Sequence, residues 1–195
     1  MSYLEKATTK KIRRYKKRDE GASLQMLTCY DYQTAQMLNQ TSVDMLLVGD
    51  SLGNVVLGFE NTVQVTTEHM KIFGAAVKRG APNKFLAVDL PFGTYATLEE
   101  GLKTSIEIFQ ASGCEAVKLE GASSTKLELI ERLTENGIPV IGHIGLTPQS
   151  IHEMGGYYTH GKEEEERTRL KQEARDLEEA GIFCLVLECV SEDLS

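Results

Sequence analysis

The 195-residue sequence has no apolar run that approaches the ~20 residues needed to cross a bilayer. Its N-terminus also lacks the apolar segment of a secretory signal. The four cysteines (Cys29, Cys114, Cys184 and Cys189) form no C-x-x-C pair, and no Cys/His group has the spacing of a zinc site. These absences predict a cytoplasmic protein with reduced thiols and no membrane partner.

Positive charge is scarce outside the first residues of the chain. Residues 1–18 hold eight Lys or Arg and a single acid, Glu5, which gives a net charge of +7. Because the whole chain has a formal charge of −8, residues 19–195 carry −15. We expect residues 1–20 to form a basic, solvated N-terminal helix or arm, since blocks of like charge usually face water. A nucleic-acid arm or a transit peptide is the alternative, but the acidic remainder argues against a nucleic-acid partner.

No linker and no change of composition divides the chain, so we expect one domain over residues 1–195. Runs rich in Leu, Val, Ile and Phe predict six buried parallel strands. These runs cover residues 24–29, 44–49, 84–90, 115–120, 138–143 and 182–188. Helical segments are expected between them, at about residues 31–40, 67–80, 98–112, 124–136, 148–153 and 163–180.

This β-α order leaves two architectures, an open doubly wound sheet or a (β/α)8 TIM barrel. An open sheet usually has a Gly-rich phosphate turn after its first strand, and residues 28–35, TCYDYQTA, have none. Charged residues instead follow several strands, as at the active-site end of TIM barrels. We therefore expect an α/β TIM barrel with only about six of its eight β-α units, so that two strands are missing or another chain supplies them.

Carboxylates follow the second and third predicted strands, which are neighbours in a barrel. Asp50 comes after MLLVG and Asp89 lies within FLAVDL, while Glu120 ends the fourth strand. Each Asp alone could be a helix or turn cap. Together with Glu120 they predict a site for Mg²⁺, which takes oxygen ligands and keeps several positions for water and substrate.

Three further residues at strand ends could take part in catalysis. Lys118 lies on the same strand face as Glu120, where it could neutralise a substrate carboxylate, form a Schiff base or make a plain salt bridge. Glu188 ends the sixth strand, and burial among apolar neighbours would disfavour its charged form, as suits a general acid or base. His143 ends the fifth strand as a hydrogen-bonding support. A cation, a lysine and an opposed glutamate could bind a 2-keto acid and make its neighbouring carbon acidic.

Residues 152–162, HEMGGYYTHGK, separate the last two predicted strands. This segment is either a mobile flap over the site or an ordinary surface loop.

Several motifs together resemble the ketopantoate hydroxymethyltransferase family. They are MLTCYDYQTA, LLVGDSLGN, VKRGAPNKFLAVDLPFGTYAT, AVKLEG, VIGHIGLTPQS, GGY and CLVLECV, and the likeness runs from about residue 20 to residue 190. GDS alone would suggest only the wider phosphoenolpyruvate mutase and isocitrate lyase superfamily. The resemblance implies a (β/α)8 barrel that transfers a hydroxymethyl group from 5,10-methylenetetrahydrofolate to 3-methyl-2-oxobutanoate through a magnesium-stabilised enolate. The product, 2-dehydropantoate, leads toward pantothenate and coenzyme A.

The resemblance also implies roles for individual residues. Asp50 and Asp89 match Mg²⁺ ligands that also contact the substrate, and Glu120 matches a further metal ligand. Ser51 and Lys118 match residues that contact the keto acid.

The catalytic residues implied by the resemblance are Glu188, as the proton acceptor, and His143, as a supporting polar residue. Family members are cytosolic homo-oligomers, commonly decamers, and continue through two more strands. The alternatives are a magnesium-dependent C–C lyase of the wider superfamily, a class I aldolase that uses Lys118, and a non-catalytic barrel fragment.

Overall fold

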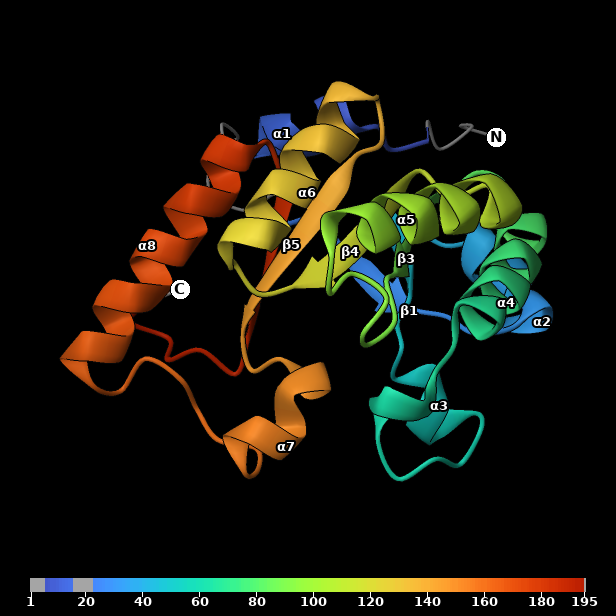
Figure 1. Cartoon of the computed structure of the whole chain (residues 1–195). Coiled ribbons are helices and arrows are strands. Elements are labelled where there is room, and N and C mark those ends of the chain that lie inside the picture. The colour runs from blue at the N-terminus through green and yellow to red at the C-terminus, as the bar shows by residue number, and fades with distance from the viewer. Residues whose placement is uncertain (1–5, 16–22, 195) are drawn as a thin grey trace.

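In the computed structural model, which describes residues 6–15 and 23–194, six parallel strands form one curled sheet (Figure 1). The strands are hydrogen-bonded in chain order, as expected for part of a barrel. They are β1 (Met26–Thr28), β2 (Met45–Val48), β3 (Phe85–Asp89), β4 (Ala116–Glu120), β5 (Val140–Gly145) and β6 (Cys184–Glu188).

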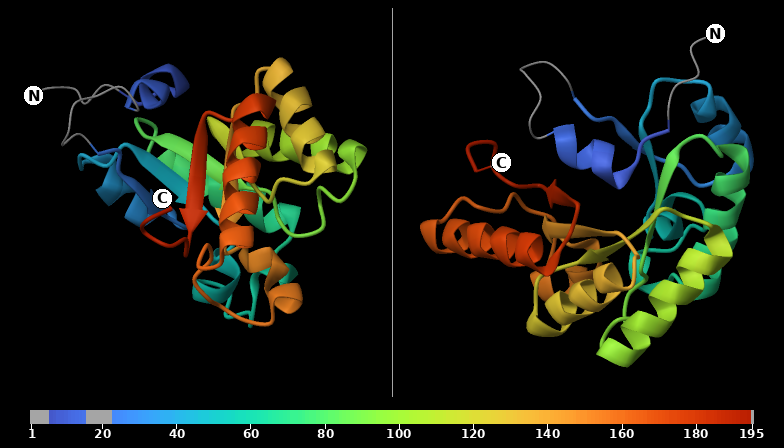
Figure 2. Two further views of the ribbon diagram at one scale, coloured as in Figure 1. Left: turned by 90° about the vertical axis from the view of Figure 1, so that its left-hand side faces the viewer. Right: turned by 90° about the horizontal axis from the view of Figure 1, so that it is seen from above.

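Helices cover the outer face of this sheet. Five of them, α2, α4, α5, α6 and α8, lie in an arc around the strands, and the arc is open on one side (Figure 2). Their bounds are α2 (Tyr32–Asn39), α4 (Thr67–Gly80), α5 (Leu98–Ser112), α6 (Ser124–Glu135) and α8 (Glu164–Ala180). Shorter elements are α1 (Thr9–Tyr15), α3 (Leu52–Val55), α7 (Ile151–Met154) and the 3₁₀ turns η1 (Thr62–Gln64) and η2 (Pro148–Ser150). The structure therefore confirms a partial α/β barrel with about six units, the last of which is represented by β6 alone among the described residues.

The two faces of the sheet form two separate packing clusters, because side chains alternate along each strand. Residues such as Leu86 and Val88 of β3 face the helices and join the larger cluster. Phe85 and Ala87 of the same strand face the barrel interior and join a second cluster. This alternation sends Asp89, the last residue of β3, to the interior.

Local sequence signals explain where the long helices begin and end. The backbone N–H of Glu100 donates a hydrogen bond to Thr97 Oγ1 at 3.3 Å, which caps the start of α5. Glu99 and Glu100 lie in the first turn, where the helix dipole favours negative charge. The helix ends at Gly113, whose φ of 68° is left-handed.

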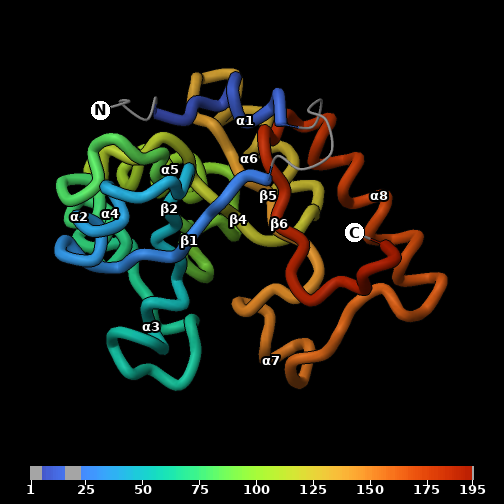
Figure 3. The backbone as a smooth tube through the Cα atoms, turned by 180° about the vertical axis from the view of Figure 1, so that it is seen from behind, coloured from blue at the N-terminus to red at the C-terminus, as the bar shows by residue number. Residues whose placement is uncertain are grey.

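In the described part of the basic N-terminal segment, the charged side chains are largely exposed and one apolar residue is buried. Its helix α1 lies across the amino ends of the strands (Figure 3), and Ile12 is buried against Phe85 and Phe183. The basic residues of α1 remain on its other faces, so the segment closes one end of the barrel interior. The rest of the predicted arm, residues 1–5 and 16–20, lies outside the described residues.

Some predicted boundaries are wrong. The fifth strand, expected at 138–143, lies at Val140–Gly145 because its pairing with β6 continues to Gly145 and Glu188. The first strand has only three residues, and the helix expected at 148–153 is a 3₁₀ turn followed by the four-residue α7.

Two of the absences noted in the sequence have counterparts in the structure. Within the described residues, no helix is long and apolar enough to cross a membrane. All four cysteines lie in the described part of the chain and form no disulfide, and Cys29 and Cys114 are buried.

Candidate active site

Five charged or polar side chains come together at the carboxyl ends of the strands. Strand alternation directs Asp89, Lys118, Glu120, His143 and Glu188 to the interior face. Strand register then pairs Asp89 with Lys118 across β3 and β4, and Glu120 with His143 across β4 and β5. The cluster therefore follows directly from parallel pairing of strands that each end in a polar residue.

Asp50 joins this cluster from the turn after β2. Its backbone N–H donates a hydrogen bond to Asp89 Oδ2 at 3.1 Å. Gly49 makes the close approach possible, because a Cβ at this position would lie 3.0 Å from Ser51 Oγ and 3.4 Å from Asp89 Oδ2. Ser51 lies at the same rim, with its Oγ 2.7 Å from the Tyr30 hydroxyl.

Lys118 provides the buried positive charge of the cluster. Its Nζ lies 2.9 Å from Asp89 Oδ1, and both side chains are almost completely buried. Burial lowers the pKa of Lys118, but the charges of Asp89, Glu120 and Asp50 outweigh this effect and raise it above its usual value. Lys118 therefore remains an ammonium group. The salt bridge with Asp89 is present, and contact with a substrate carboxylate stays a prediction.

The three buried carboxylates outnumber the lysine. Burial and the charge of Asp89 raise the pKa of Asp50 to about 7. Burial also raises the pKa of Asp89, although Lys118 opposes the shift. Asp89 Oδ1 is buried and ion-paired with Lys118. Three buried carboxylates around one ammonium group leave an excess of negative charge that fits a bound cation.

Glu120 differs from the two aspartates in its contacts. Its Oε2 accepts a hydrogen bond from the Gln149 backbone N–H at 3.1 Å, and its Oε1 lies 3.5 Å from His143 Nδ1. Within the described residues, no group of three or more His, Cys, Asp or Glu is placed to hold a metal ion. The roles of Asp50, Asp89 and Glu120 as metal ligands stay predictions.

His143 lies between Glu120 and Glu188. Its Nε2 is 3.3 Å from Glu188 Oε2, and its Nδ1 is 3.3 Å from Lys118 Nζ. Burial lowers the pKa of His143, but hydrogen bonding to Glu120 and Glu188 raises it overall. The imidazole thus links Glu188 to the carboxylate cluster.

Glu188 is more exposed than the sequence suggested. Its side chain is 39% exposed, because β6 is an edge strand with no neighbour on its far side. The expected burial among apolar residues is therefore wrong for this chain, although the contact with His143 keeps Glu188 at the site.

Gln149 is a site residue that the sequence reasoning missed. It follows Pro148 in η2 and is 6% exposed. Its side-chain amide contacts Asp50, Leu90 and Tyr95. The available signal was its place directly after a strand end in GLTPQS, but nothing in the sequence showed that this turn reaches the neighbouring strands.

The segment at residues 152–162 is anchored at its C-terminal end. The backbone N–H of His160 donates to the Cys189 carbonyl at 2.7 Å, and the N–H of Ser191 donates to the His160 carbonyl at 2.9 Å. The Tyr158 ring lies 4.2 Å, centroid to centroid, from the buried His160 ring. The segment therefore ends against the residues that directly follow Glu188.

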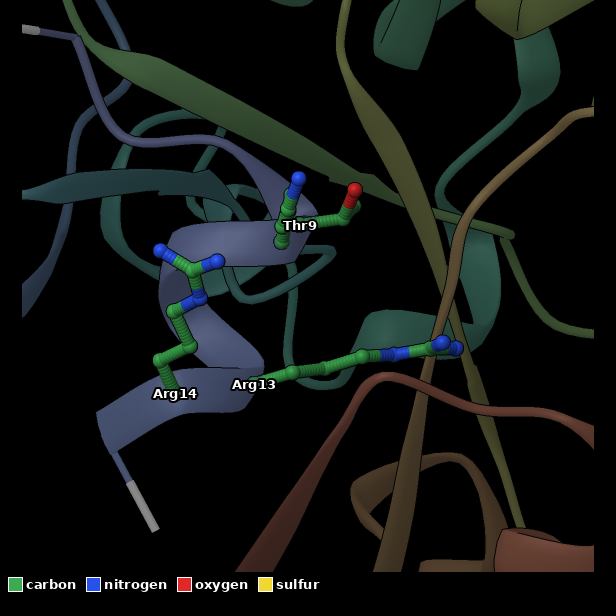
Figure 4. Close-up of a pocket in the computed structure, with 4 residues that line it drawn as sticks. Thr9, Arg13 and Arg14 are labelled. Atoms are coloured by element: carbon green, nitrogen blue, oxygen red, sulfur yellow. The ribbon is translucent and has the colours of Figure 1, made fainter. Parts of the chain in front are cut away.

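A depression lies at the opposite end of the barrel from the polar cluster. Thr9, Lys10, Arg13 and Arg14 of α1 line this depression of about 340 Å³. Figure 4 shows that Arg13 and Arg14 point in different directions, and Arg13 donates to the Gly181 carbonyl at 3.3 Å. The two guanidinium groups do not converge, so this depression is a weaker candidate for a functional site than the polar cluster.

Comparison with solved structures defines the class of fold. The chain superimposes on 2,3-dimethylmalate lyase, a member of the phosphoenolpyruvate mutase/isocitrate lyase superfamily, with a TM-score of 0.65 and 18% identity, covering 95% of this chain and 63% of that one. It also matches phosphonopyruvate hydrolase in complex with oxalate and Mg²⁺, with a TM-score of 0.67 and 11% identity, over 93% and 63% of the two chains. These likenesses show an α/β barrel fold over most of this chain.

Comparison of sequences identifies the family. The family model for ketopantoate hydroxymethyltransferase matches residues 6–195. The 3-methyl-2-oxobutanoate hydroxymethyltransferase of Leptospira biflexa is 46% identical over 94% of this chain and 69% of its own length. That of Bacillus licheniformis is 49% identical over 92% of this chain and 65% of its own length. The chain belongs to the ketopantoate hydroxymethyltransferase family and spans roughly two thirds of these relatives.

Proposed function

We propose that the protein transfers a hydroxymethyl group from 5,10-methylenetetrahydrofolate to 3-methyl-2-oxobutanoate, giving 2-dehydropantoate for pantothenate and coenzyme A biosynthesis. The observation that carries the proposal is the buried cluster of Asp50, Asp89 and Lys118 at the carboxyl ends of neighbouring strands. Family membership supplies the identity of the substrates, and the cluster supplies the groups that such a keto acid needs.

Asp50 and Asp89 would hold Mg²⁺, with Glu120 beside them. The ion would supply Lewis-acid stabilisation of negative charge that develops on the keto acid. Asp89 Oδ1 already faces the Lys118 ammonium group at 2.9 Å, so it is the excess of carboxylates over that one cation that suits the site to a metal ion. Asp50, Asp89, Ser51 and Lys118 would also contact the substrate.

The protein's own residues would bind and orient the keto acid. The Lys118 ammonium group offers a buried positive charge for the substrate carboxylate, and its ion pair with Asp89 holds it in place. The Ser51 hydroxyl can donate to a substrate oxygen while its contact with Tyr30 fixes its position. These contacts would orient the carbon beside the carbonyl toward Glu188.

Glu188 would accept the proton from that carbon, which forms the enolate. One water would hydrolyse the methylene bridge, breaking both C–N bonds and releasing tetrahydrofolate and a one-carbon unit at the oxidation level of formaldehyde. The enolate carbon would then bond to this one-carbon unit, and its oxygen would take the proton back from Glu188 and become the new hydroxyl group. His143 supports this role because its Nε2 lies 3.3 Å from Glu188 Oε2, where a protonated imidazole would stabilise the carboxylate. The same imidazole lies beside Glu120 and Lys118. A change of charge at the cation site would therefore also alter the electrostatic environment of Glu188.

We also propose that the enzyme acts in the cytoplasm as a homo-oligomer, a decamer by family resemblance. Its partners would be the keto acid and the folate, with no nucleic acid and no membrane.

The test is folate-dependent turnover of the purified chain, followed by formation of 2-dehydropantoate with Mg²⁺ and again with a chelator. The proposal expects product only when both the folate and the metal are present. Product formation that is unaffected by the chelator would contradict the metal-dependent mechanism. No product under any condition, from a chain that is folded by circular dichroism, would support the non-catalytic fragment instead.

A further inference from the structure

We infer that Gln149 is a positioning residue that fixes the carboxylate of Asp50 in the orientation needed at the cation site. The inference rests on the function proposed above. It goes beyond that function by assigning a role to a residue that touches neither the substrate nor the cation in the proposed mechanism.

Each hydrogen-bonding group of the Gln149 side chain has a protein partner. Nε2 donates to Asp50 Oδ2 at 2.8 Å and to the Leu90 carbonyl at 2.9 Å, and Oε1 accepts a short hydrogen bond from the Tyr95 hydroxyl. The two amide hydrogens are thus both used, and the amide oxygen is satisfied as well.

The surroundings leave only one orientation for this amide. A carbonyl can only accept, so the amide –NH₂ must face Leu90. The Tyr95 hydroxyl donates to the opposite side and holds Oε1 there. Nε2 therefore has to face Asp50, where it engages Oδ2 and leaves Oδ1 outside this contact.

The backbone of Gln149 ties the same turn to a third strand end. Its N–H donates to Glu120 Oε2 at 3.1 Å, so one residue bonds to groups at the carboxyl ends of β2, β3 and β4. These hydrogen bonds fix the positions of the Asp50 and Glu120 carboxylates relative to each other. Partners of this kind orient metal ligands from outside the coordination shell.

A neutral donor suits this position. The site already holds one buried ammonium group, Lys118, and a second cation beside Asp50 would cancel the negative charge that attracts a metal ion. An amide orients the carboxylate without adding charge.

The experiment measures Mn²⁺ binding to the chain by electron paramagnetic resonance, with Mn²⁺ as a probe for the magnesium site. Gln149→Met keeps the length of the side chain but removes both donors. We expect its Mn²⁺ affinity to fall about 10-fold to 100-fold, as for other outer partners of metal ligands. Gln172→Met is the matched control, because Gln172 also donates its amide to an aspartate, Asp176, at 2.7 Å, but on the exposed face of α8.

Two further variants separate the possible outcomes. Asp50→Asn should abolish binding and thus show that the signal comes from this site. Tyr95→Phe removes the donor that holds Gln149 Oε1, so it should weaken Mn²⁺ binding, but less than Gln149→Met does. If Gln149→Met does not fold, the Mn²⁺ affinity of Tyr95→Phe tests the positioning role instead.

Unchanged Mn²⁺ affinity in a folded Gln149→Met or Tyr95→Phe variant would overturn the positioning role while leaving the proposed function intact. No Mn²⁺ binding by the unsubstituted chain, or undiminished binding by Asp50→Asn, would instead overturn the proposed metal site and the inference with it.

Discussion

Lys118 has two chemical uses in keto-acid enzymes, as a Schiff-base nucleophile or as a fixed positive charge, and its surroundings favour the second. A Schiff base needs a neutral amine. The neighbouring carboxylates of Asp89, Glu120 and Asp50 instead raise the pKa of Lys118, and its Nζ is paired with Asp89 at 2.9 Å. The buried lysine is therefore better suited to neutralising a substrate carboxylate than to the class I aldolase alternative.

Glu188→Gln tests the role of the proton acceptor. The amide keeps the size and shape of the side chain but cannot take a proton, so exchange of the substrate's α-proton into D₂O should fall by about 10²-fold to 10⁴-fold. Binding of the keto acid should persist, because Lys118 and Ser51 are unchanged. Nuclear magnetic resonance of 3-methyl-2-oxobutanoate in D₂O measures both exchange and binding.

The control for this variant is Glu165→Gln, the same change on the exposed first turn of α8. It should exchange the proton at the unsubstituted rate. Equal rates for Glu188→Gln and Glu165→Gln would show that another group takes the proton.

Single residues were predictable from the sequence where strand periodicity decides their direction. Lys118 and Glu120 are two apart on one strand, so their shared face follows from alternation alone. Gln149 was not predictable in this way, because its contacts depend on a turn after β5 reaching groups beyond β2 and β3. The exposure of Glu188 was missed because it depends on which strand forms the edge.

At the scale of elements, the close approach of β5 to β6 restricts which residues can occupy position 145. Gly145 has a φ of 90°, and a Cβ there would lie 2.3 Å from the Glu188 carbonyl oxygen. Gly145→Ala should therefore cost more than the roughly 1–2 kcal/mol of left-handed backbone strain, since the strand that carries Glu188 must also move. Denaturant unfolding measures the loss of stability, and proton exchange measures the displacement of Glu188.

Gly137→Ala is the matched control, because Gly137 has a φ of 82° and open space where the Cβ would lie. It carries the strain without the clash. If both variants lost the same stability and kept full proton exchange, the close approach of Gly145 to the Glu188 backbone would not be needed to position Glu188.

The anchor between α8 and the segment before it predicts a pH effect. Glu166 accepts hydrogen bonds from the Gly161 N–H at 2.6 Å and from His160 Nδ1 at 2.8 Å. Burial raises the pKa of Glu166, but Gly161, His160 and Arg169 lower it overall from the usual 4.5. A carboxylate with a lowered pKa stabilises the fold above its unfolded pKa, and this stabilisation is lost as the pH falls through the folded value.

Glu166→Gln should therefore destabilise the chain at neutral pH and flatten the acid side of its stability curve below pH 4.5. Urea unfolding at a series of pH values measures this. Glu164→Gln, at a side chain that is 86% exposed, should leave the curve unchanged. If stability fell equally below pH 4.5 in the Glu166 variant and the unsubstituted chain, the hydrogen bonds of Glu166 would not anchor this segment.

Long elements were predicted well and short ones poorly, for a physical reason. The helices expected at 67–80 and 98–112 are α4 and α5, because their caps and apolar spacing are local signals. The four-residue helices α3 and α7 have too little local preference to be seen in the sequence. They depend on the turns that the barrel places around them.

At the scale of the whole molecule, the sheet has two edges where a closed barrel has none. The residues of β3, β4 and β5 are all buried, whereas β1 and β6 are largely exposed or half-buried, including Leu27 at 47% and Leu187 at 41%. Beside β6, a cavity of about 830 Å³ lies between α1, α8 and the strand. Exposed parallel edges with apolar residues are templates for pairing with another chain.

We therefore predict that the 195-residue chain either self-associates or has a low melting temperature. Size-exclusion chromatography with light scattering, together with a thermal melt, should show this for the chain alone. A version extended by the part of a relative's sequence that this chain does not cover should be monodisperse and more stable. A monodisperse monomer that is as stable as the extended version would show that six strands suffice.

The most direct test of the central claim is exchange of the α-proton of 3-methyl-2-oxobutanoate in D₂O, followed by nuclear magnetic resonance without any folate. The claim is that the cluster at the strand ends activates a keto acid with the help of a divalent cation. We predict that the proton signal disappears with Mg²⁺ and persists with a chelator. A signal that persists with Mg²⁺, or disappears equally with the chelator, would contradict the account.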